Sequence, residues 1–266
     1  MLPLPEAKAP RTREPLVGET TFAQSKLARE DAERLDPSGV AARLASCSMN
    51  ASCDWKSLLP GKFVVFDGPD GSGKTTQFRQ LADAATAAGV ETVEVREPGG
   101  TAIGEKIRAI LLDPLHAEMV TRCEMLLYMA SRAQLVEERV RPALARGAFV
   151  LADRFISSTL AYQGTAGGID RESILAIGEI AIGGRWPDLV VVFDVDSETA
   201  ARRISPTRDR MEQKDAAYHA RVRGGYLDQA RADPTHYLVI DATREPEAVF
   251  GSLVEGMSAR LGASAK

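Results

Sequence analysis

The sequence predicts an α/β protein in which a parallel sheet of about five strands has helices on both faces. Short apolar runs rich in β-branched residues recur along the chain, and a segment with helical periodicity follows each run. Glycine, proline and aspartate mark the boundaries between these segments. Strands that alternate with helices form a parallel sheet, and ligands bind at the carboxyl ends of its strands.

A glycine-rich loop follows the first predicted strand, residues 63–66. Residues 68–75, GPDGSGKT, fit the G-x-x-x-x-G-K-[ST] pattern of a phosphate-binding loop. The glycines let the backbone amides turn inward onto one anion, and a helix that begins near Gly73 directs its positive end at the same anion. A glycine-rich turn without a ligand is the alternative, and the order of strand, loop and helix disfavours it.

The loop predicts a site for a nucleoside triphosphate with Mg²⁺. Lys74 presents an ammonium group to the β- and γ-phosphates, and the hydroxyl of Thr75 contacts the Mg²⁺ that bridges them. The predicted ATP-binding residues are Gly68, Pro69, Asp70, Gly71, Ser72, Gly73, Lys74, Thr75 and Thr76.

The other elements follow in alternation. Strands are expected over residues 90–96, 149–152, 189–195 and 237–241, and helices over 74–88, 101–112, 119–146, 170–183 and 213–232 and from 197 and 245 onward. Thr101 is a predicted N-cap, and Gly89 and Gly147 follow predicted helix ends. The strand over 149–152 places Asp153 and Arg154 at its carboxyl end, where ligands bind.

Composition limits what surrounds this core. The chain has 266 residues, of which 44% are hydrophobic, and can therefore bury one α/β core of about two hundred residues. A net charge of −4 argues against a broad nucleic-acid-binding surface. No apolar run approaches the roughly 20 residues of a membrane span, and no secretory signal is present. We expect a soluble, cytoplasmic protein that binds neither nucleic acid nor a membrane.

Residues 1–60 differ from the rest of the chain. The opening stretch is rich in proline and charge, which favours disorder, and its balance of acidic and basic residues argues against a transit peptide. We expect a flexible N-terminal extension without a catalytic role, followed by a nucleotide-binding domain over residues 61–266. A partner-binding or targeting arm is the alternative.

Five segments, in this order and spacing, resemble the thymidylate kinase (dTMP kinase) family: FDGPDGSGKTT, REPGG, EMLLYMASRAQL, DRFISSTLAYQG and DRMEQ. The resemblance spans about residues 62–261. REPGG together with DRF…AYQG is more specific than the phosphate-binding loop, which many unrelated nucleotide enzymes share. The resemblance implies a P-loop NTPase-type fold like that of nucleoside monophosphate kinases. It also implies Mg²⁺-dependent transfer of the ATP γ-phosphoryl group to dTMP, and a homodimer formed through long helices.

Transfer to a phosphate monoester requires cations rather than a strong base, because the accepting oxygen is already ionised near neutral pH. Cations hold the two nucleotides together and neutralise charge as the phosphoryl group moves. The candidates are Arg108, Arg132, Arg154, Arg208 and Arg210. Any one of them alone would be interpreted as a solvated surface charge, and the resemblance favours a site role for the first three.

The resemblance implies roles for four residues around the acceptor phosphate and the metal. Arg108 and Arg154 would hold the phosphate of dTMP, and Asp153 would act near Mg²⁺ through water. The alternative for Asp153 is a capping carboxylate. Asp70 matches an acidic position that faces the acceptor sugar and the metal. Its carboxylate is costly in an anion-binding loop, so we expect a hydroxyl or cation partner.

A second set matches the residues that recognise thymine in the family. Tyr128 aligns with the aromatic residue that stacks on the base, and Arg132, one helical turn later, would reach an exocyclic oxygen. Periodicity alone also allows Tyr128 to be a core aromatic residue. Thr159 and Gln163 match positions that hydrogen-bond the pyrimidine edge, and Tyr162 matches the position that excludes a 2′-hydroxyl.

Residues 202–213 occupy the place of the lid that closes over the donor phosphates. Gly71 lies where some family members have arginine, whereas the lid has Arg208 and Arg210, as in the bacterial subtype whose lid supplies the transition-state arginine. Which of the two arginines acts is left open. Asp67 and Phe155 replace the usual glutamate and the usual tyrosine or histidine. The predicted catalytic residues are Lys74, Asp153, Arg154, Arg208 and Arg210.

Three other functions remain open at this point. One is a different nucleoside monophosphate or deoxynucleoside kinase, which turnover of dTMP, dUMP, UMP and thymidine would distinguish. A nucleotide-dependent switch is disfavoured because the chain contains no N-K-x-D guanine motif. A non-catalytic nucleotide-binding homologue is disfavoured by the presence of Lys74, Asp153 and Arg154.

Overall fold

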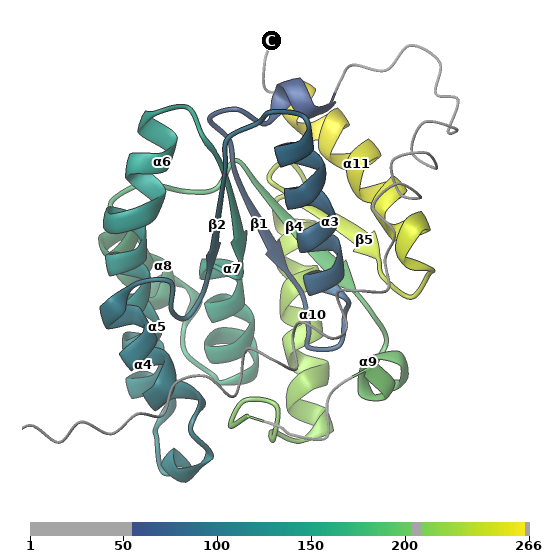
Figure 1. Ribbon diagram of the computed structural model, residues 1–266. Helices are drawn as coiled ribbons and strands as arrows, with labels where there is room; N and C mark the ends of the chain where they lie inside the picture. The colour runs from purple at the N-terminus through teal and green to yellow at the C-terminus, as the bar shows by residue number, and fades with distance from the viewer. Residues whose placement is uncertain (1–54, 204–208, 264–266) are drawn as a thin grey trace, which may run out of the picture. The chain divides into compact units, whose positions relative to one another are not determined.

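One parallel sheet organises the part of the chain that the computed structural model describes, residues 55–203 and 209–263. Its five strands lie in the order β2-β3-β1-β4-β5. Their bounds are β1 (Phe63–Asp67), β2 (Thr92–Arg96), β3 (Phe149–Asp153), β4 (Leu189–Asp194) and β5 (Tyr237–Asp241) (Figure 1). The predicted α/β fold class with about five parallel strands is confirmed.

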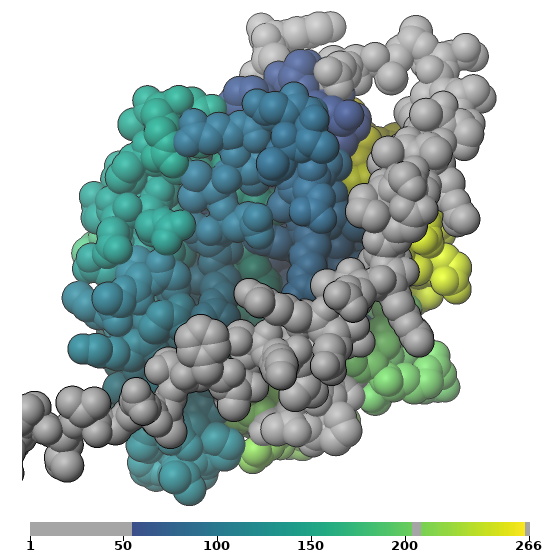
Figure 2. Space-filling view, in the orientation of Figure 1, coloured from purple at the N-terminus to yellow at the C-terminus, as the bar shows by residue number. Residues whose placement is uncertain are grey.

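The central strand β1 is buried along its whole length, and its side chains alternate between two apolar clusters. Phe63 and Val65 face one cluster, and Val64 and Phe66 face the other. The first cluster includes residues of α5 (Thr121–Leu135), α8 (Arg171–Ile182) and α10 (Ala216–Ala232), and the second includes residues of α3 (Lys74–Ala87) and α11 (Pro246–Ala263). Figure 2 shows the side chains of α3 covering the strands on the second face. Helices therefore cover both faces of the sheet, as predicted.

Capping residues fix several helix ends where the sequence predicts them. The hydroxyl of Thr101 accepts a hydrogen bond of 3.0 Å from the amide of Gly104 at the start of α4 (Ala102–Leu112). Asp170 caps α8 in the same way, and Gly183 ends that helix in the left-handed conformation. Gly89, just after α3, has a φ of 79°.

The single helix predicted over residues 119–146 is instead three consecutive segments. They are α5, the π-helical segment η4 (Val136–Val140) and α6 (Arg141–Ala145). Pro142 explains the change, because a proline lacks the amide that a regular helix needs at this point, and the wider turn directly precedes it.

A second difference lies directly after β3. Residues that the sequence left without an element form α7 (Ile156–Thr159) and the π-helical segment η5 (Leu160–Ala166). Their serine, threonine and glycine content gives little helical preference. Packing supplies it, since η5 makes extensive contacts with α10 and most of its residues are buried. Two further short helical segments are η3 (Pro114–His116) and α9 (Ser197–Arg203).

The described residues begin six positions before the expected start of the domain. A short 3₁₀ helix, η2 (Trp55–Leu58), packs against α11, and the side chain of Leu59 is fully buried beside it. The expected flexibility of residues 1–54 concerns a part of the chain outside the described residues. No helix among the described residues is long and apolar enough to cross a membrane.

Candidate active site

The described residues form a cavity of about 640 Å³ at the carboxyl ends of the neighbouring strands β1 and β3. Its walls come from the loop after β1, from α4 and α5, and from the end of β3 with the helical segment that follows. The predicted site residues among the lining are Asp70, Gly71, Ser72, Gly73, Lys74, Thr75, Thr76, Arg108, Tyr128, Asp153, Arg154, Thr159, Tyr162 and Gln163. Residues far apart in the sequence thus meet around one space.

The loop after β1 depends on glycine at two positions where the chain passes close to other backbone. A Cβ on Gly68, whose φ is 135°, would lie 2.5 Å from the carbonyl oxygen of Phe193. A Cβ on Gly71, whose φ is 77°, would lie 2.5 Å from the carbonyl oxygen of Ala200. An arginine cannot fit at Gly71 in this packing, which accounts for one departure from the family pattern.

The side chain of Lys74 points back into the loop. Its Nζ donates hydrogen bonds to the carbonyl oxygens of Gly68 and Pro69, at 3.2 and 3.3 Å. Burial lowers the pKa of Lys74, and the nearby Arg154 lowers it further, while Asp153 and two other carboxylates act in the opposite direction. An ammonium group held only by carbonyls can exchange them for phosphate oxygens.

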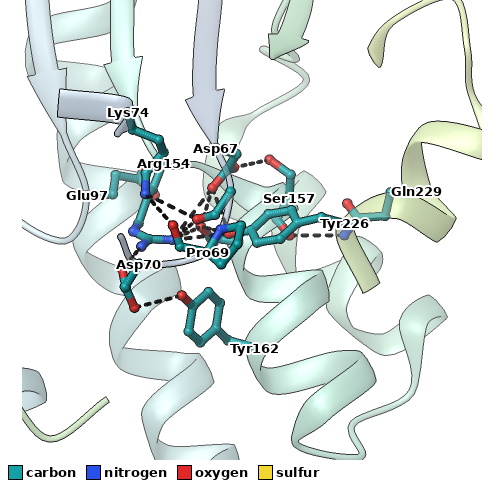
Figure 3. A network of polar contacts seen from close by, with 12 residues as sticks. Asp67, Pro69, Asp70, Lys74, Glu97, Arg154, Ser157, Tyr162, Tyr226 and Gln229 are labelled. Carbon is teal, nitrogen blue, oxygen red and sulfur yellow. Dashed lines mark hydrogen bonds and ion pairs between the residues drawn. The ribbon is translucent and has the colours of Figure 1, made fainter. Parts of the chain in front are cut away.

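Arg154 connects the loop to the opposite wall (Figure 3). It is the only non-glycine among the described residues with a positive φ, 70°. Its guanidinium forms an ion pair with Asp70, donates to Gly68 O at 3.3 Å, and lies over the ring of Tyr162 at 5.2 Å. The hydroxyl of Tyr162 donates to the other oxygen of Asp70 at 3.0 Å. The expectation that Asp70 has hydroxyl and cation partners is therefore confirmed.

The environment keeps Asp70 ionised. Burial raises the pKa of this carboxyl, but the charges of Arg154 and Lys74 and the hydrogen bond from Tyr162 outweigh burial, so its pKa lies below the ordinary value. Arg154 therefore balances the negative charge that Asp70 gives to the loop.

Behind Arg154 lies a fully buried carboxylate that the sequence did not indicate as a site residue. Asp67 accepts hydrogen bonds from the hydroxyls of Ser157, Ser158 and Tyr226, the last at 2.8 Å (Figure 3). Ser158 and Tyr226 in turn accept from the Arg154 guanidinium at 3.2 and 3.1 Å. Tyr226 belongs to α10, so this network holds Arg154 from three elements.

Two groups on the loop side suit a divalent cation. Asp153 has a buried Oδ1 without a hydrogen-bond partner among the described residues, and the hydroxyl-bearing Thr75 lines the same cavity. Carboxylate and hydroxyl oxygens are ligands that Mg²⁺ prefers, and Mg²⁺ in such sites takes its other ligands from phosphates and water. The described residues contain no cluster of three or more metal-binding side chains, so phosphate oxygens would be needed to complete the coordination.

The wall formed by α4 and α5 holds the residues predicted to bind the acceptor. Arg108 lines the cavity and donates to Pro98 O at 2.9 Å. Burial and the neighbouring Arg96 lower the pKa of Arg108. Tyr128 also lines the cavity, and burial, followed by the charge of Glu124, raises its pKa, so its phenol is neutral.

Arg132 lies behind this wall rather than on it. Its guanidinium is 1% exposed, contacts Glu97 through Nε and Nη2 at 2.7 and 2.6 Å, and donates to Thr159 Oγ1 at 3.2 Å. Burial raises the pKa of Glu97 to about 7, although Arg132 acts against this shift. Glu97 and Thr159 line the cavity whereas Arg132 does not, so a direct contact between Arg132 and a base stays a prediction.

Of the two lid arginines, the structure describes Arg210 but not Arg208. Arg210 is buried, forms an ion pair with Glu124 at 2.6 Å, donates to Leu111 O at 2.7 Å, and does not line the cavity. Arg208 falls in residues 204–208, outside the described part of the chain. The ion pair with Glu124 and the hydrogen bond to Leu111 O hold the Arg210 guanidinium away from the cavity.

Several lining residues were missed by the sequence reasoning. Glu97 follows β2, Ala242 follows β5, and Arg203 ends α9 and donates to Ala242 O at 2.8 Å. Arg244 and Glu212 also line the cavity. The rule that ligands bind at the carboxyl ends of strands could have indicated Glu97 and Ala242. Arg203 and Glu212 fall within residues 202–213, which the sequence analysis assigned to the lid, but no residue type or spacing there indicated either one as a site residue.

Comparison with known proteins gives consistent matches. The sequence profile of the family described as thymidylate kinase matches residues 66–252. A protein named thymidylate kinase from Desulforudis audaxviator (strain MP104C) is 48% identical over 189 residues, which is 70% of this chain and 86% of the relative. One from Nitratidesulfovibrio vulgaris (strain DSM 19637 / Miyazaki F) is 40% identical over 213 residues, 77% of this chain and 99% of the relative. A crystal structure of thymidylate kinase from Ehrlichia chaffeensis matches with a TM-score of 0.61 and 31% identity, covering 74% of this chain and 97% of that one.

Proposed function

The chain belongs to the thymidylate kinase family, and on this premise we propose that it transfers the γ-phosphoryl group of ATP to dTMP, giving dTDP and ADP. The observation that supports this proposal is that the phosphate-binding loop, Arg108, Arg154 and Tyr128 line one cavity of the described residues. Placing two bound nucleotides end to end between fixed cations is most of what such a reaction needs from a protein.

The residues divide the work of binding. Loop amides and Lys74 hold the donor phosphates, and Arg108 and Arg154 hold the acceptor phosphate. Asp70 and that phosphate both contact Arg154. The other oxygen of Asp70 accepts a hydrogen bond from the Tyr162 hydroxyl, and this carboxylate faces the acceptor sugar. Tyr162 closes the space beside the sugar, so a 2′-hydroxyl would clash or remain unpaired.

Mg²⁺ would be held by Asp153 and Thr75 together with phosphate oxygens. The ion would neutralise the charge that develops on the transferred phosphoryl group. The buried Oδ1 of Asp153 supports this assignment, since an unpartnered carboxylate oxygen is costly without a cation.

We assign the lid contribution to Arg208. Arg210 is engaged by Glu124 and Leu111 O, whereas Arg208 lies in the part of the lid between α9 and Asp209. In the bacterial subtype that the sequence resembles, an arginine of the lid neutralises charge on the transferred group.

A homodimer is part of the proposal. Large apolar side chains are exposed on three helices that pack side by side, with α5 between α4 and α8 (Figure 1). These side chains are Ile103 at 53%, Ile110 at 44%, Leu126 at 52% and Ile180 at 83% exposure. A second copy covering this face would bury them, and sedimentation equilibrium at micromolar concentration tests this. We also propose a cytoplasmic location.

The extension is proposed to be dispensable for transfer. Removing residues 1–54 should leave kcat and both KM values unchanged. Removing residues 1–59 should also remove Leu59 from the core and lower the free energy of unfolding by about 2 to 3 kcal/mol. A loss of turnover in the shorter deletion would instead indicate that the extension acts in catalysis.

One assay tests the reaction itself. ADP release is coupled to NADH oxidation, with dTMP, dUMP, UMP and thymidine as acceptors, each with and without Mg²⁺. The proposal expects turnover with dTMP that depends on Mg²⁺, weaker turnover with dUMP, and none with thymidine. Preferred turnover of UMP or thymidine would identify a different kinase, and no turnover with any acceptor would identify a non-catalytic homologue.

A further inference from the structure

The buried carboxylate of Glu124 on α5 lies between the end of the lid and the cavity. Its Oε2 is 2.6 Å from Nη2 of Arg210, and its Oε1 accepts a hydrogen bond of 2.6 Å from Nε2 of Gln163. All three side chains are buried, at 3%, 5% and 2% exposure. Of the three, Gln163 alone lines the cavity.

Glu124 is fixed by more than one contact. Arg210 is anchored to the end of α4, because its backbone amide donates to Leu112 O at 3.2 Å and its Nε donates to Leu111 O at 2.7 Å. The arginine therefore holds an ionised carboxylate in a set position. An ionised carboxylate accepts hydrogen bonds and cannot donate them.

This constraint decides which way the amide of Gln163 points. A glutamine amide has a donor end and an acceptor end, and an acceptor such as Glu124 selects the donor end. Gln163 lines the cavity, and among the hydrogen bonds of the described residues none is donated to its Oε1, so this oxygen is available to a ligand in the cavity. The cavity wall thus presents a hydrogen-bond acceptor of fixed polarity.

We propose that Glu124 is a positioning residue that sets the pyrimidine selectivity of the kinase through Gln163. Thymine has an N–H donor at N3, whereas cytosine has an acceptor there, so a fixed acceptor on the wall favours thymine and leaves two facing acceptors with cytosine. The inference rests on the proposed function, because it assumes a pyrimidine in this cavity. The opposite amide orientation would reverse the preference.

The neighbouring hydroxyl cannot supply the same discrimination. Thr159 Oγ1 accepts a hydrogen bond from Arg132 Nη1 at 3.2 Å. The hydroxyl can rotate to direct either its hydrogen or a lone pair at the base. A hydroxyl therefore serves either base. Glu124, which is fixed by Arg210, removes this freedom from Gln163.

The variant Glu124→Gln tests the proposal, because glutamine has the same shape but can both donate and accept. Its matched control is Glu138→Gln, since Glu138 Oε2 also accepts from a glutamine amide, Gln134 Nε2 at 3.0 Å, on the exposed surface. The substrates are dTMP and 5-methyl-dCMP, which share the methyl group. The measured quantity is the ratio of their kcat/KM values.

We expect the ratio to fall about tenfold or more in Glu124→Gln, mainly through a lower kcat/KM for dTMP, with the KM for ATP unchanged. The control should keep the wild-type ratio. A residue that only stabilises the fold would lower turnover of both substrates equally, and an unchanged ratio would overturn the proposal.

A second variant covers the case in which Glu124→Gln leaves Arg210 unpaired and unfolds the protein, which circular dichroism would report. Gln163→Leu keeps the ion pair between Glu124 and Arg210 and removes the amide, and it should lower the ratio to the same extent. If Gln163→Leu retains the wild-type ratio, the proposal is wrong. Failure of the wild type to phosphorylate dTMP would refute the proposed function instead, so the two failures are distinguishable.

Discussion

The two sides of the cavity are built in different ways. On the side that we propose binds the donor, the phosphate-binding loop consists of consecutive residues, and among the described residues Lys74 bonds only to carbonyls of that loop. On the side that we propose binds the acceptor, and behind its wall, three arginines from separate segments are each paired with a carboxylate from another segment. These pairs are Arg154 with Asp70, Arg132 with Glu97 and Arg210 with Glu124.

The difference has an energetic consequence. A site made of main chain keeps its shape when a side chain changes, whereas removing one partner of a buried ion pair leaves the other charge uncompensated. Changes on the donor side should therefore alter chemistry with little effect on the fold. Changes on the acceptor side should alter selectivity, binding and stability together.

The largest effect is expected from Lys74→Ala. Removing a preorganised cation from the transferred phosphates should lower kcat by about a thousandfold, while the Kd for dTMP and the melting temperature remain near the wild-type values. The coupled assay measures kcat and calorimetric titration measures dTMP binding.

Lys62→Ala is the matched control, because Lys62 precedes β1 and pairs with Asp188 outside the cavity. It should retain wild-type turnover. Unchanged turnover in Lys74→Ala would refute the role of this ammonium group.

Arg154→Lys tests the acceptor side directly. Lysine keeps the positive charge but loses the planar group that contacts Asp70, Gly68 O and Tyr226 at once. We expect kcat/KM for dTMP to fall about a hundredfold, which corresponds to about 2.7 kcal/mol, with little change in the KM for ATP. Steady-state kinetics with each substrate varied in turn measures both effects.

Arg146→Lys is its control, since Arg146 pairs with Glu91 on the surface with about half of each side chain exposed. A comparable rise in the KM for ATP in Arg154→Lys would contradict the separation between the two sides.

The pair between Arg132 and Glu97 predicts a pH dependence of stability. Burial raises the pKa of Glu97 from 4.5 to about 7 in the folded protein, so folding favours the protonated form. The raised pKa of Glu97 therefore increases the free energy of unfolding. This increase is fully present below pH 4.5 and is lost as the pH rises through about 7. It amounts to at most about 3 kcal/mol.

Glu97→Gln should remove this titration. Urea unfolding at pH 5 and at about pH 8 should show a smaller pH dependence of unfolding free energy in the variant than in the wild type. Glu91→Gln, at an exposed ion pair, should behave like the wild type. Equal pH dependence in Glu97→Gln and the wild type would show that Arg132 keeps Glu97 ionised throughout.

The same contrast explains what could be predicted from the sequence. The loop from Gly68 to Thr75 was predictable because its residues are consecutive and its chemistry is local. The strands were predictable because parallel strands buried on both faces are short apolar runs. The helix over η5 was not, because its stability comes from packing against α10 rather than from its own residues.

The acceptor side was only partly predictable. The resemblance indicated Arg132 and Arg210, but not that each is buried against a carboxylate distant in the sequence. The contact between Asp67 and Tyr226 joins residues 159 positions apart, and neither lies in a motif that indicates the other. Such pairs depend on how α10 packs on the sheet, which single-residue patterns do not encode.

The smallest effect is expected from Tyr226→Phe. This variant is also the sharpest test of the difference between the two sides of the cavity. The change removes one hydroxyl that donates to Asp67 at 2.8 Å and accepts from Arg154 at 3.1 Å, and leaves the fully buried ring in place. Arg154 then loses one of its fixed contacts, and we expect the KM for dTMP to rise about fivefold, as for loss of one net hydrogen bond. Tyr237→Phe is the matched control, because its hydroxyl donates to Gln229 Oε1 at 3.0 Å and does not contact Arg154. A similar rise in both variants would mean that the effect comes from general loosening of α10, and a rise in the KM for ATP alone would place Tyr226 on the donor side.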